Sequence, residues 1–308
     1  MINGVINIYK EKGYTSHDVV AKLRGILKQK KIGHTGTLDP DATGVLPVCL
    51  GKGTKLCDIL LDKDKTYKAV LIFGISTDTE DISGKVIESM DVDKIRDMVS
   101  DIDIVEAIKS FIGVYKQLPP MYSAIKINGK KLYELAREGK VVERSLREVE
   151  IKNISIEKIE FPRVYFEVTC SKGTYIRSLC RDIGSRLKCP SCMEELSRTR
   201  VSQFDISESI TLDKVRELVE SGEIDNYVLP VDEALNKYQR VTVKEEFTKL
   251  VHNGNGIFAN MLSSHITIKG NEMVRVYDVY NNFIGLYQSD GKPDKLKLYK
   301  MFYEKNEG

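Results

Sequence analysis

A segment near the N-terminus, residues 33–44, can present a reactive carboxylate from a loop. Its sequence is Gly-His-Thr-Gly-Thr-Leu-Asp-Pro-Asp-Ala-Thr-Gly, and neither a helix nor a strand periodicity runs through it. Asp39 precedes a proline, which favours an extended backbone at Asp39. Glycines at 33, 36 and 44 allow another group to approach the backbone closely. A carboxylate held in this way can act as a nucleophile when a neighbouring cation keeps it ionised. An ordinary Gly/Asp/Pro turn is the alternative interpretation.

Two other groups of residues could bind a metal ion, and we expect neither to do so. Cys189 and Cys192 form a C-x-x-C, but a zinc site needs a second pair of ligands, and none lies at suitable spacing. Asp78, Glu80 and Asp81 could bind a hard cation, but a solvated loop is the favoured interpretation. The chain also has no dinucleotide-binding or P-loop fingerprint, so we expect no cofactor and no metal.

Basic residues are clustered although the net charge is only +2. They gather in residues 19–38, 126–147 and 171–188, whereas acidic residues gather in 78–106. A single basic run is usually a solvated helix face. Three runs opposed by one acidic block favour a polarised surface that binds a polyphosphate, because neutralised phosphates release counterions.

The elements that must position these residues mix strands and helices without regular βαβ alternation, which favours an α+β fold. We expect strands at 5–9, 66–74, 122–127, 149–159, 163–170 and 200–204. We expect helices at 16–28, 56–61, 93–111, 130–137, 175–187 and 211–219. Ser16 and Thr211 are the expected N-caps, and Asn128-Gly129 is an expected turn.

The character of the sequence changes near residue 240. One helix is expected at 243–251, followed by strands at 273–279, 283–287 and 296–303 with tight turns between them. We therefore expect a domain of residues 1–239 and a small β-rich domain of residues 240–308. The chain has neither a run of eighteen apolar residues nor the features of a secretory signal, so we expect no membrane span and a cytoplasmic protein.

The segment G-H-T-G-T-L-D-P-x-A-T-G-V-L-P resembles the catalytic motif of the bacterial TruB family of tRNA pseudouridine-55 synthases. Residues 64–67, 171–179 and 196–198 are similar to further motifs of that family, and residues 120–133 are similar to a stretch special to its tRNA branch, within an insert at about 120–147. One departure is Tyr9-Lys10-Glu11, which stands where the family usually has Asp-Lys-Pro.

The resemblance implies an enzyme, an isomerase that converts uridine 55 in the T-loop of tRNA to pseudouridine. It implies a mixed, largely antiparallel sheet flanked by helices, followed by a PUA-like RNA-binding domain. The target base must be flipped out of its loop. The uracil then leaves its sugar through N1 and rejoins through C5.

The resemblance also implies three catalytic residues. Asp39 is the nucleophile and attacks either the sugar C1′ or the uracil C6. Arg177 pairs with Asp39 and keeps its pKa low, unless it is a phosphate or surface contact. Tyr67 stacks on the flipped base and offers a hydroxyl near C5 for proton removal, unless it is a half-buried strand tyrosine.

Further residues are expected to bind the substrate. His34 fills the place that the flipped base leaves in the base stack, unless it is a hydrogen-bonded loop histidine. Tyr175 and Leu196 form walls of the pocket, although Leu196 could equally be a core residue. The remaining expected contacts are Lys10, Lys126, Lys130 and Arg198.

The implied partner is the T-stem-loop of tRNA, with no membrane, no obligatory protein partner and a monomeric chain. Two alternatives remain open. The chain could be a noncatalytic RNA-binding or tRNA-folding protein on the same fold, or a pseudouridine synthase subunit that depends on a guide RNA.

Overall fold

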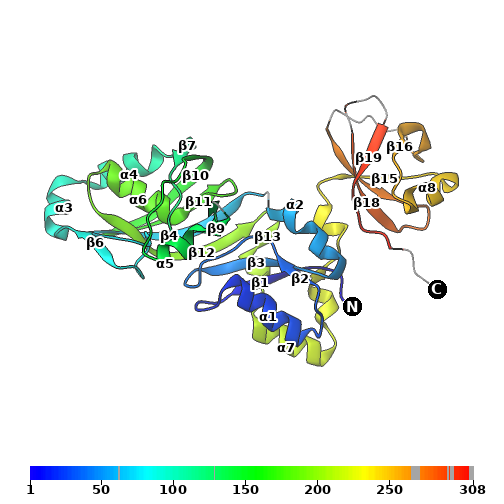
Figure 1. Cartoon of the computed structure of the whole chain (residues 1–308), viewed down its shortest axis with the longest axis horizontal. Helices are drawn as coiled ribbons and strands as arrows, with labels where there is room; N and C mark the ends of the chain where they lie inside the picture. Colours follow the sequence, from blue (N-terminus) through cyan, green and yellow to red (C-terminus); the bar gives the residue numbers. More distant parts are fainter. Residues whose placement is uncertain (62, 128, 265–270, 290, 292–294, 305–308) are drawn as a thin grey trace.

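The computed structural model describes residues 1–61, 63–127, 129–264, 271–289, 291 and 295–304. A larger body is followed by a smaller one built around its own sheet, and the two lie side by side (Figure 1). Across the described residues, no helix combines the length and the apolar character needed to cross a membrane.

The larger body is built on a sheet of ten strands among the described residues. Its order is β14-β1-β3-β12-β4-β11-β10-β7, with β2 beside β3 and β13 beside β12. The pairings are antiparallel except for β3 with β12, which confirms the expected mixed, largely antiparallel sheet. The bounds are β1 Gly4–Lys10, β2 Ile32–His34, β3 Thr43–Leu50, β4 Lys65–Phe73, β7 Gly113–Gln117, β10 Arg147–Glu160, β11 Arg163–Cys170, β12 Ser191–Val201, β13 Phe204–Asp205 and β14 Val228–Leu229.

Helices cover the two halves of this sheet separately (Figure 1). α1 (Ser16–Ile26) and α7 (Leu212–Ser221) bury their apolar faces in one cluster with β1 and β3. α4 (Asp101–Lys109) and α6 (Ile176–Arg186) do so in a second cluster with β4 and β11. Each cluster stabilises its half by removing apolar surface from water. Shorter elements are α2 Cys57–Leu61, α3 Val92–Met98, α5 Leu132–Arg137, β5 Ile75–Thr77, β6 Val86–Ser89, β8 Lys126–Ile127 and β9 Lys130–Lys131.

The smaller body has a five-stranded sheet in the order β15-β17-β18-β19-β16 among the described residues. Its elements are β15 Gln239–Thr242, α8 Thr248–His252, β16 Ile257–Phe258, β17 Met273–Tyr277, β18 Phe283–Ser289 and β19 Lys295–Met301. It has an apolar cluster of its own. At the junction, Lys300 Nζ lies 2.6 Å from the Asp58 carboxylate of α2.

Four expected boundaries were wrong. Thr15, rather than Ser16, caps α1, and its side chain accepts the N–H of Asp18. β12 begins nine residues before the expected position 200, because register irregularities against β4 interrupt its alternation. The strand expected at 122–127 forms only at β8, and the turn residue Asn128 lies outside the described residues. The helix expected at 243–251 is a 3-10 turn followed by α8.

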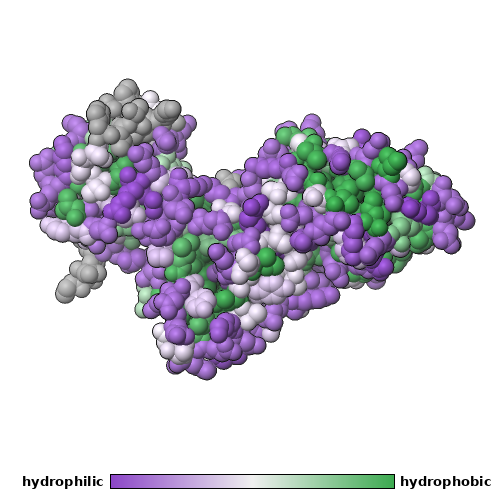
Figure 2. Space-filling view, turned by 180° about the vertical axis from the view of Figure 1, so that it is seen from behind, coloured by the Kyte–Doolittle hydropathy of each residue, from purple (hydrophilic) through white to green (hydrophobic). Residues whose placement is uncertain are grey.

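The surface is mostly hydrophilic. The most extensive apolar area in Figure 2 lies at the end of the larger body remote from the smaller body, and smaller apolar areas lie on the middle part of the molecule. Exposed apolar residues from elements at that end are Ile87 of β6, Ile102 of α4 and Val114 of β7.

Candidate active site

The loop between β2 and β3 holds Asp39 in place through its neighbours on both sides. The Leu38 side chain is buried in the core, and its N–H donates to Ser16 Oγ at 2.9 Å. The Pro40 carbonyl accepts a hydrogen bond from Lys10 Nζ at 3.0 Å. Between these two anchors the Asp39 side chain stays 40% accessible. The loop is therefore fixed while its carboxylate can be reached from solvent.

Lys10 at the end of β1 is fully buried. Its ammonium donates to the carbonyls of Glu11, Tyr14 and Pro40 at 3.1, 2.6 and 3.0 Å. Burial lowers the pKa of Lys10 to about 8, against the opposing influence of Asp39. Because three carbonyls already occupy the ammonium, the geometry favours a role in holding the loop over the expected contact with RNA.

Arg177, in the first turn of α6, grips the Asp39 carboxylate at two points. Arg177 Nε lies 3.0 Å from Oδ2, and Nη2 donates to Oδ1 at 3.2 Å. The Arg177 side chain is only 7% exposed, and its remaining donors reach the carbonyls of Thr79 and Tyr122 at 3.0 Å each. Asp81 Oδ2 lies 3.5 Å from Nη1. A guanidinium held on several sides fixes the direction of a bidentate partner.

The expectation that Arg177 keeps the pKa of Asp39 low was wrong in its net direction. Burial of the carboxylate raises the pKa of Asp39 above its ordinary value, and Arg177 and Lys10 oppose this while Asp81 and Asp41 reinforce it. Part of the side chain stays accessible, but the surrounding protein removes part of the hydration of the charged form, and this cost outweighs the attraction of the guanidinium. A carboxylate with less hydration is also freer to attack a substrate atom.

Tyr67 of β4 is more deeply buried than a half-buried strand tyrosine, because it pairs with strands on both sides. Its partners are Val168 of β11 and Arg198 of β12. Burial raises the pKa of the Tyr67 hydroxyl. The hydroxyl is therefore protonated in the resting protein, and it must give up that proton before it can accept one from a substrate.

Tyr175 is held in place by Gln117, a residue that the sequence reasoning missed. The Tyr175 N–H donates to Gln117 Oε1 at 2.8 Å, and Gln117 Nε2 donates back to the Tyr175 carbonyl at 3.0 Å. Gln117 is fully buried and ends β7, three residues before the stretch that resembles the tRNA branch. That proximity was the only signal for it in the sequence.

Leu196 and Arg198 lie close together on β12 and have different surroundings. Leu196 is half-buried and packs against the cluster that contains Tyr67. Arg198 is fully buried and donates through Nε to the Val45 carbonyl at 2.8 Å and through Nη2 to the Gly36 carbonyl at 3.2 Å. The geometry therefore favours Arg198 as a support for the loop rather than a contact with substrate.

His34 ends β2 with its ring against that of His17, the two centroids 5.4 Å apart. Burial lowers the pKa of His34, which favours the neutral ring. Its Nδ1 atom is buried without a hydrogen-bond partner among the described residues. A neutral aromatic ring suits stacking against a base.

Lys126 and Lys130 lie on the hairpin of β8 and β9 in the insert. Both are exposed, and Lys130 Nζ lies 3.5 Å from Glu138 Oε1. Within the described part of the chain, the structure gives neither of them a contact with Asp39. The insert instead reaches the site through the Tyr122 carbonyl bound to Arg177.

The solvated loop expected for Asp78, Glu80 and Asp81 was wrong for two of these residues. Glu80 is 8% exposed, and its carboxylate accepts the Ser178 hydroxyl at 2.6 Å and pairs with Arg181. Asp81 faces the guanidinium of Arg177. Both carboxylates therefore bind side chains of α6. No group of three or more potential ligands among the described residues is arranged to hold a metal.

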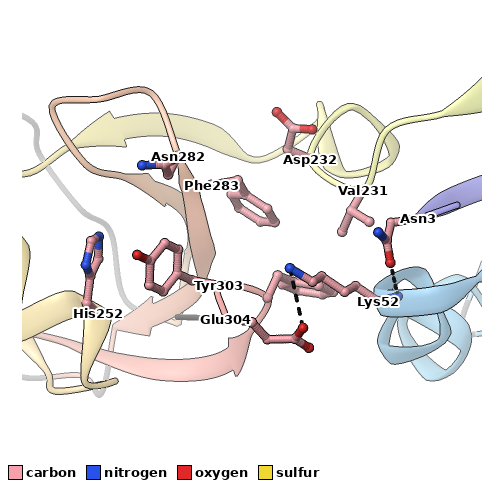
Figure 3. Close-up of a pocket in the computed structure, with 10 residues that line it drawn as sticks. Asn3, Lys52, Val231, Asp232, His252, Asn282, Phe283, Tyr303 and Glu304 are labelled. Atoms are coloured by element: carbon pink, nitrogen blue, oxygen red, sulfur yellow. Dashed lines mark hydrogen bonds and ion pairs between the residues drawn. The ribbon is translucent and has the colours of Figure 1, made fainter. Parts of the chain in front are cut away.

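A cavity of about 750 Å³ lies away from this site, at the junction of the two bodies (Figure 3). His252, Phe283 and Tyr303 line it from the smaller body, and Asn3 and Lys52 line it from the larger one. Its lining contains no member of the Asp39 site.

Comparisons with known proteins agree with this arrangement. A family model described as "TruB family pseudouridylate synthase (N terminal domain)" matches residues 24–176, and "tRNA pseudouridylate synthase B C-terminal domain" matches residues 177–236. Curated proteins named tRNA pseudouridine synthase B are 50% identical in Lachnoclostridium phytofermentans, over 98% of this chain and 100% of that one, and 45% identical in Alkaliphilus oremlandii, over 99% and 100%.

Solved structures show the same fold. The chain matches one from "Crystal Structure of a Cbf5-Nop10-Gar1 Complex" with a TM-score of 0.74 and 29% identity, over 97% of this chain and 85% of that one. It matches one from "Structure of H/ACA RNP bound to a substrate RNA containing 2'-deoxyuridine" with a TM-score of 0.73 and 26% identity, over 98% and 86%.

Proposed function

The chain belongs to the TruB family of pseudouridylate synthases, and we propose that it acts on uridine 55 in the T-loop of tRNA with Asp39 as its nucleophile. It is a tRNA pseudouridine synthase, an isomerase, as its curated relatives are named over nearly their whole length. The observation that carries the proposal is the two-point contact between Arg177 and Asp39. A purely binding surface has no need of a carboxylate held and aimed in this way by a buried guanidinium.

The reaction moves one bond within the substrate. An Asp39 oxygen attacks the flipped nucleotide either at C1′, where it displaces uracil through N1, or at C6, where it adds to the ring. The N1–C1′ bond breaks, the uracil turns, and a C5–C1′ bond forms. The C5 proton is then lost, N1 gains a proton, and Asp39 departs, which gives pseudouridine with no net change in composition. Arg177 keeps the attacking oxygen directed throughout.

The walls around Asp39 have to keep the detached uracil in place. Tyr67 provides a ring for stacking, and we assign its hydroxyl to the C5 proton, which requires that it first pass its own proton on. Tyr175 and Leu196 close the pocket with apolar surface, which limits hydrolysis of the intermediate. His34 takes the place of the flipped base in the base stack of the RNA loop.

RNA binding extends beyond the pocket. The exposed side chains of the three basic runs, including Lys126 and Lys130 of the insert, contact phosphates, whereas Arg177 and Arg181 are paired within the protein. Residues 1–239 form the catalytic domain, and residues 240–308 form a PUA-like domain that contributes binding rather than chemistry. The chain works as a cytoplasmic monomer.

The solved relatives leave one competing function. One is from an H/ACA RNP bound to a substrate RNA and the other from a Cbf5-Nop10-Gar1 complex, whereas the curated relatives at 43–50% identity are named as tRNA pseudouridine synthases. The insert at about 120–147, which resembles the tRNA branch, speaks against a guided subunit. The retained trio of Asp39, Tyr67 and Arg177 speaks against a noncatalytic binding protein, since binding alone would not require it.

Purified protein alone should test this function. Incubated with a folded tRNA transcript, it should form pseudouridine at position 55, and a transcript with cytidine there should gain none. Conversion that begins only after a guide RNA or other proteins are added would favour the guided subunit. Tight binding without any conversion would favour the noncatalytic alternative.

A further inference from the structure

We propose that Glu80 is a positioning residue, which ties the turn of residues 77–84 to α6 so that Arg177 holds Asp39 in its attacking direction. The proposal rests on the function proposed above for Asp39 and Arg177, and it adds a residue that touches neither the substrate nor the nucleophile. Four features of the turn carry it: backbone shape, side-chain ties, strand contacts and neighbours.

The backbone of Glu80 is unusual. Its φ of +66° lies in the left-handed region, which residues other than glycine, asparagine and aspartate seldom occupy. Such a conformation persists where the surroundings enforce it, and it gathers at functional sites. The turn is therefore held in a shape that the local sequence would not choose by itself.

The Glu80 side chain supplies part of that enforcement. Its Oε2 accepts the Ser178 hydroxyl at 2.6 Å, and its Oε1 pairs with Arg181 Nη1. Ser178 directly follows Arg177 in the chain, and Arg181 lies one helical turn later. A buried carboxylate that engages both residues fixes the turn to the same part of α6 that carries Arg177.

Strand contacts fix the other side of the turn. The Met193 N–H of β12 donates to the Glu80 carbonyl at 3.1 Å, and the Ile82 N–H donates to the Met193 carbonyl at 2.9 Å. Glu80 thus connects β12, which its backbone contacts, to α6, which its side chain contacts.

The two neighbours of Glu80 both act on Arg177. The Thr79 carbonyl accepts from Arg177 Nη1 at 3.0 Å, and Asp81 Oδ2 lies 3.5 Å from the same nitrogen. If the Glu80 ties are lost, both contacts can shift together. Arg177 then still binds the Tyr122 carbonyl and Asp39, but fewer contacts fix the orientation of its guanidinium.

The test compares Glu80→Ala, Glu80→Gly and Glu80→Gln in single-turnover conversion, tRNA binding and thermal melting. Alanine removes both ties, and glycine removes them while relieving the left-handed backbone. Glutamine keeps a hydrogen-bonding group of the same size. Asp182→Asn is the matched control, because Asp182 binds the same Arg181 side chain and has no contact with the turn among the described residues.

We expect alanine and glycine each to lower the maximal rate about tenfold or more, since misplacing reacting groups by about 1 Å can cost about a hundredfold. Binding of tRNA should stay within about twofold of wild type. Glutamine should recover most of the rate, and Asp182→Asn should leave it unchanged. If the alanine variant does not fold, Ser178→Ala removes one tie without altering residue 80 and should also lower the rate.

A rate within twofold of wild type for folded Glu80→Ala would overturn the proposal. So would full recovery in Glu80→Gly, because backbone shape alone would then suffice, or an equal loss in Asp182→Asn. An inactive Asp39→Asn protein in the same assay separates these outcomes, because it upholds the nucleophile even where Glu80 proves dispensable.

Discussion

At Asp39, burial and ion pairing act on one carboxylate in opposite directions. Burial raises its pKa, Arg177 and Lys10 lower it, and the nearby carboxylates Asp81 and Asp41 raise it again. An ionised nucleophile is needed for attack. The pH at which activity begins therefore reports on this balance directly.

We expect the acidic limb of the pH–rate profile to lie above the ordinary aspartate value of 3.8. Activity should fall as the pH drops through the raised pKa, because protonation removes the nucleophile. Asp81→Asn removes a negative charge that raises this pKa, so the limb should move to lower pH. Single-turnover rates across the acidic range measure it. A limb that stays in place or moves upward in Asp81→Asn would contradict this electrostatic account.

The sequence identified the Asp39 segment, Tyr67 and Arg177 because their motifs are contiguous and specific. It did not predict the role proposed for Glu80, because an acidic residue in a loop is expected to be solvated when its partner on α6 is not known. Lys10 and Arg198 were predicted to contact the substrate, because their partners within the protein could not be known from the sequence either. Their bonds to backbone carbonyls at the Asp39 loop come from residues distant in the chain, which no local pattern shows.

Among the elements, α1 has a second task besides packing. Ser16 in its first turn is fully buried, and its hydroxyl accepts the Leu38 N–H at 2.9 Å and contacts the Leu38 carbonyl at 3.4 Å. The sequence suggested Ser16 as the helix cap, but Thr15 does that work. Ser16 is thereby free to hold the loop that carries Asp39.

Ser16→Ala should lower the free energy of unfolding by about 1–3 kcal/mol, because the Leu38 N–H is left buried without a partner. The maximal rate should fall as well, since the Asp39 loop loses an anchor. Thermal melting and single-turnover assays measure the two effects. Ser185→Ala is the control, because that hydroxyl bonds to a helix carbonyl near the surface. Equal behaviour of the two variants would refute the anchoring role.

Element boundaries were predictable where periodicity was unbroken. α7 and its Thr211 cap were expected and are present. β12 was largely missed, because its irregular pairing with β4 hides the alternation expected of a strand. The parallel pairing of β3 with β12 was also beyond sequence reasoning, because it joins segments about 150 residues apart.

On the scale of the whole molecule, the two bodies share part of their core. Leu286 and Phe302 of the smaller body belong to one apolar cluster with Leu56 and Leu235 of the larger one. Ion pairs of Lys300 with Asp58 and of Lys52 with Glu304 add to this junction. A cut between the bodies would expose apolar surface, so RNA binding is better tested on the intact chain.

Binding of tRNA by the intact chain should weaken steeply with salt if the three basic runs contact RNA. Each phosphate contact steepens the log–log slope by about 0.9 on a duplex and about 0.7 on a single strand. Affinities measured from low to moderate salt give the slope. Replacing Lys126 and Lys130 with alanine should make it shallower by up to about two units. A slope near zero would show that these side chains form only a solvated face.

The central claim is that Asp39 attacks the substrate, and Asp39→Asn tests it most directly. Asparagine preserves size and shape but removes the charge and the nucleophile. Arg177 keeps its bonds to the Thr79 and Tyr122 carbonyls, so the fold should survive, which a melting curve checks first. With enzyme in excess over tRNA, the variant should bind as wild type does and form no pseudouridine. A folded variant that converts uridine within a few fold of the wild-type rate would contradict the account.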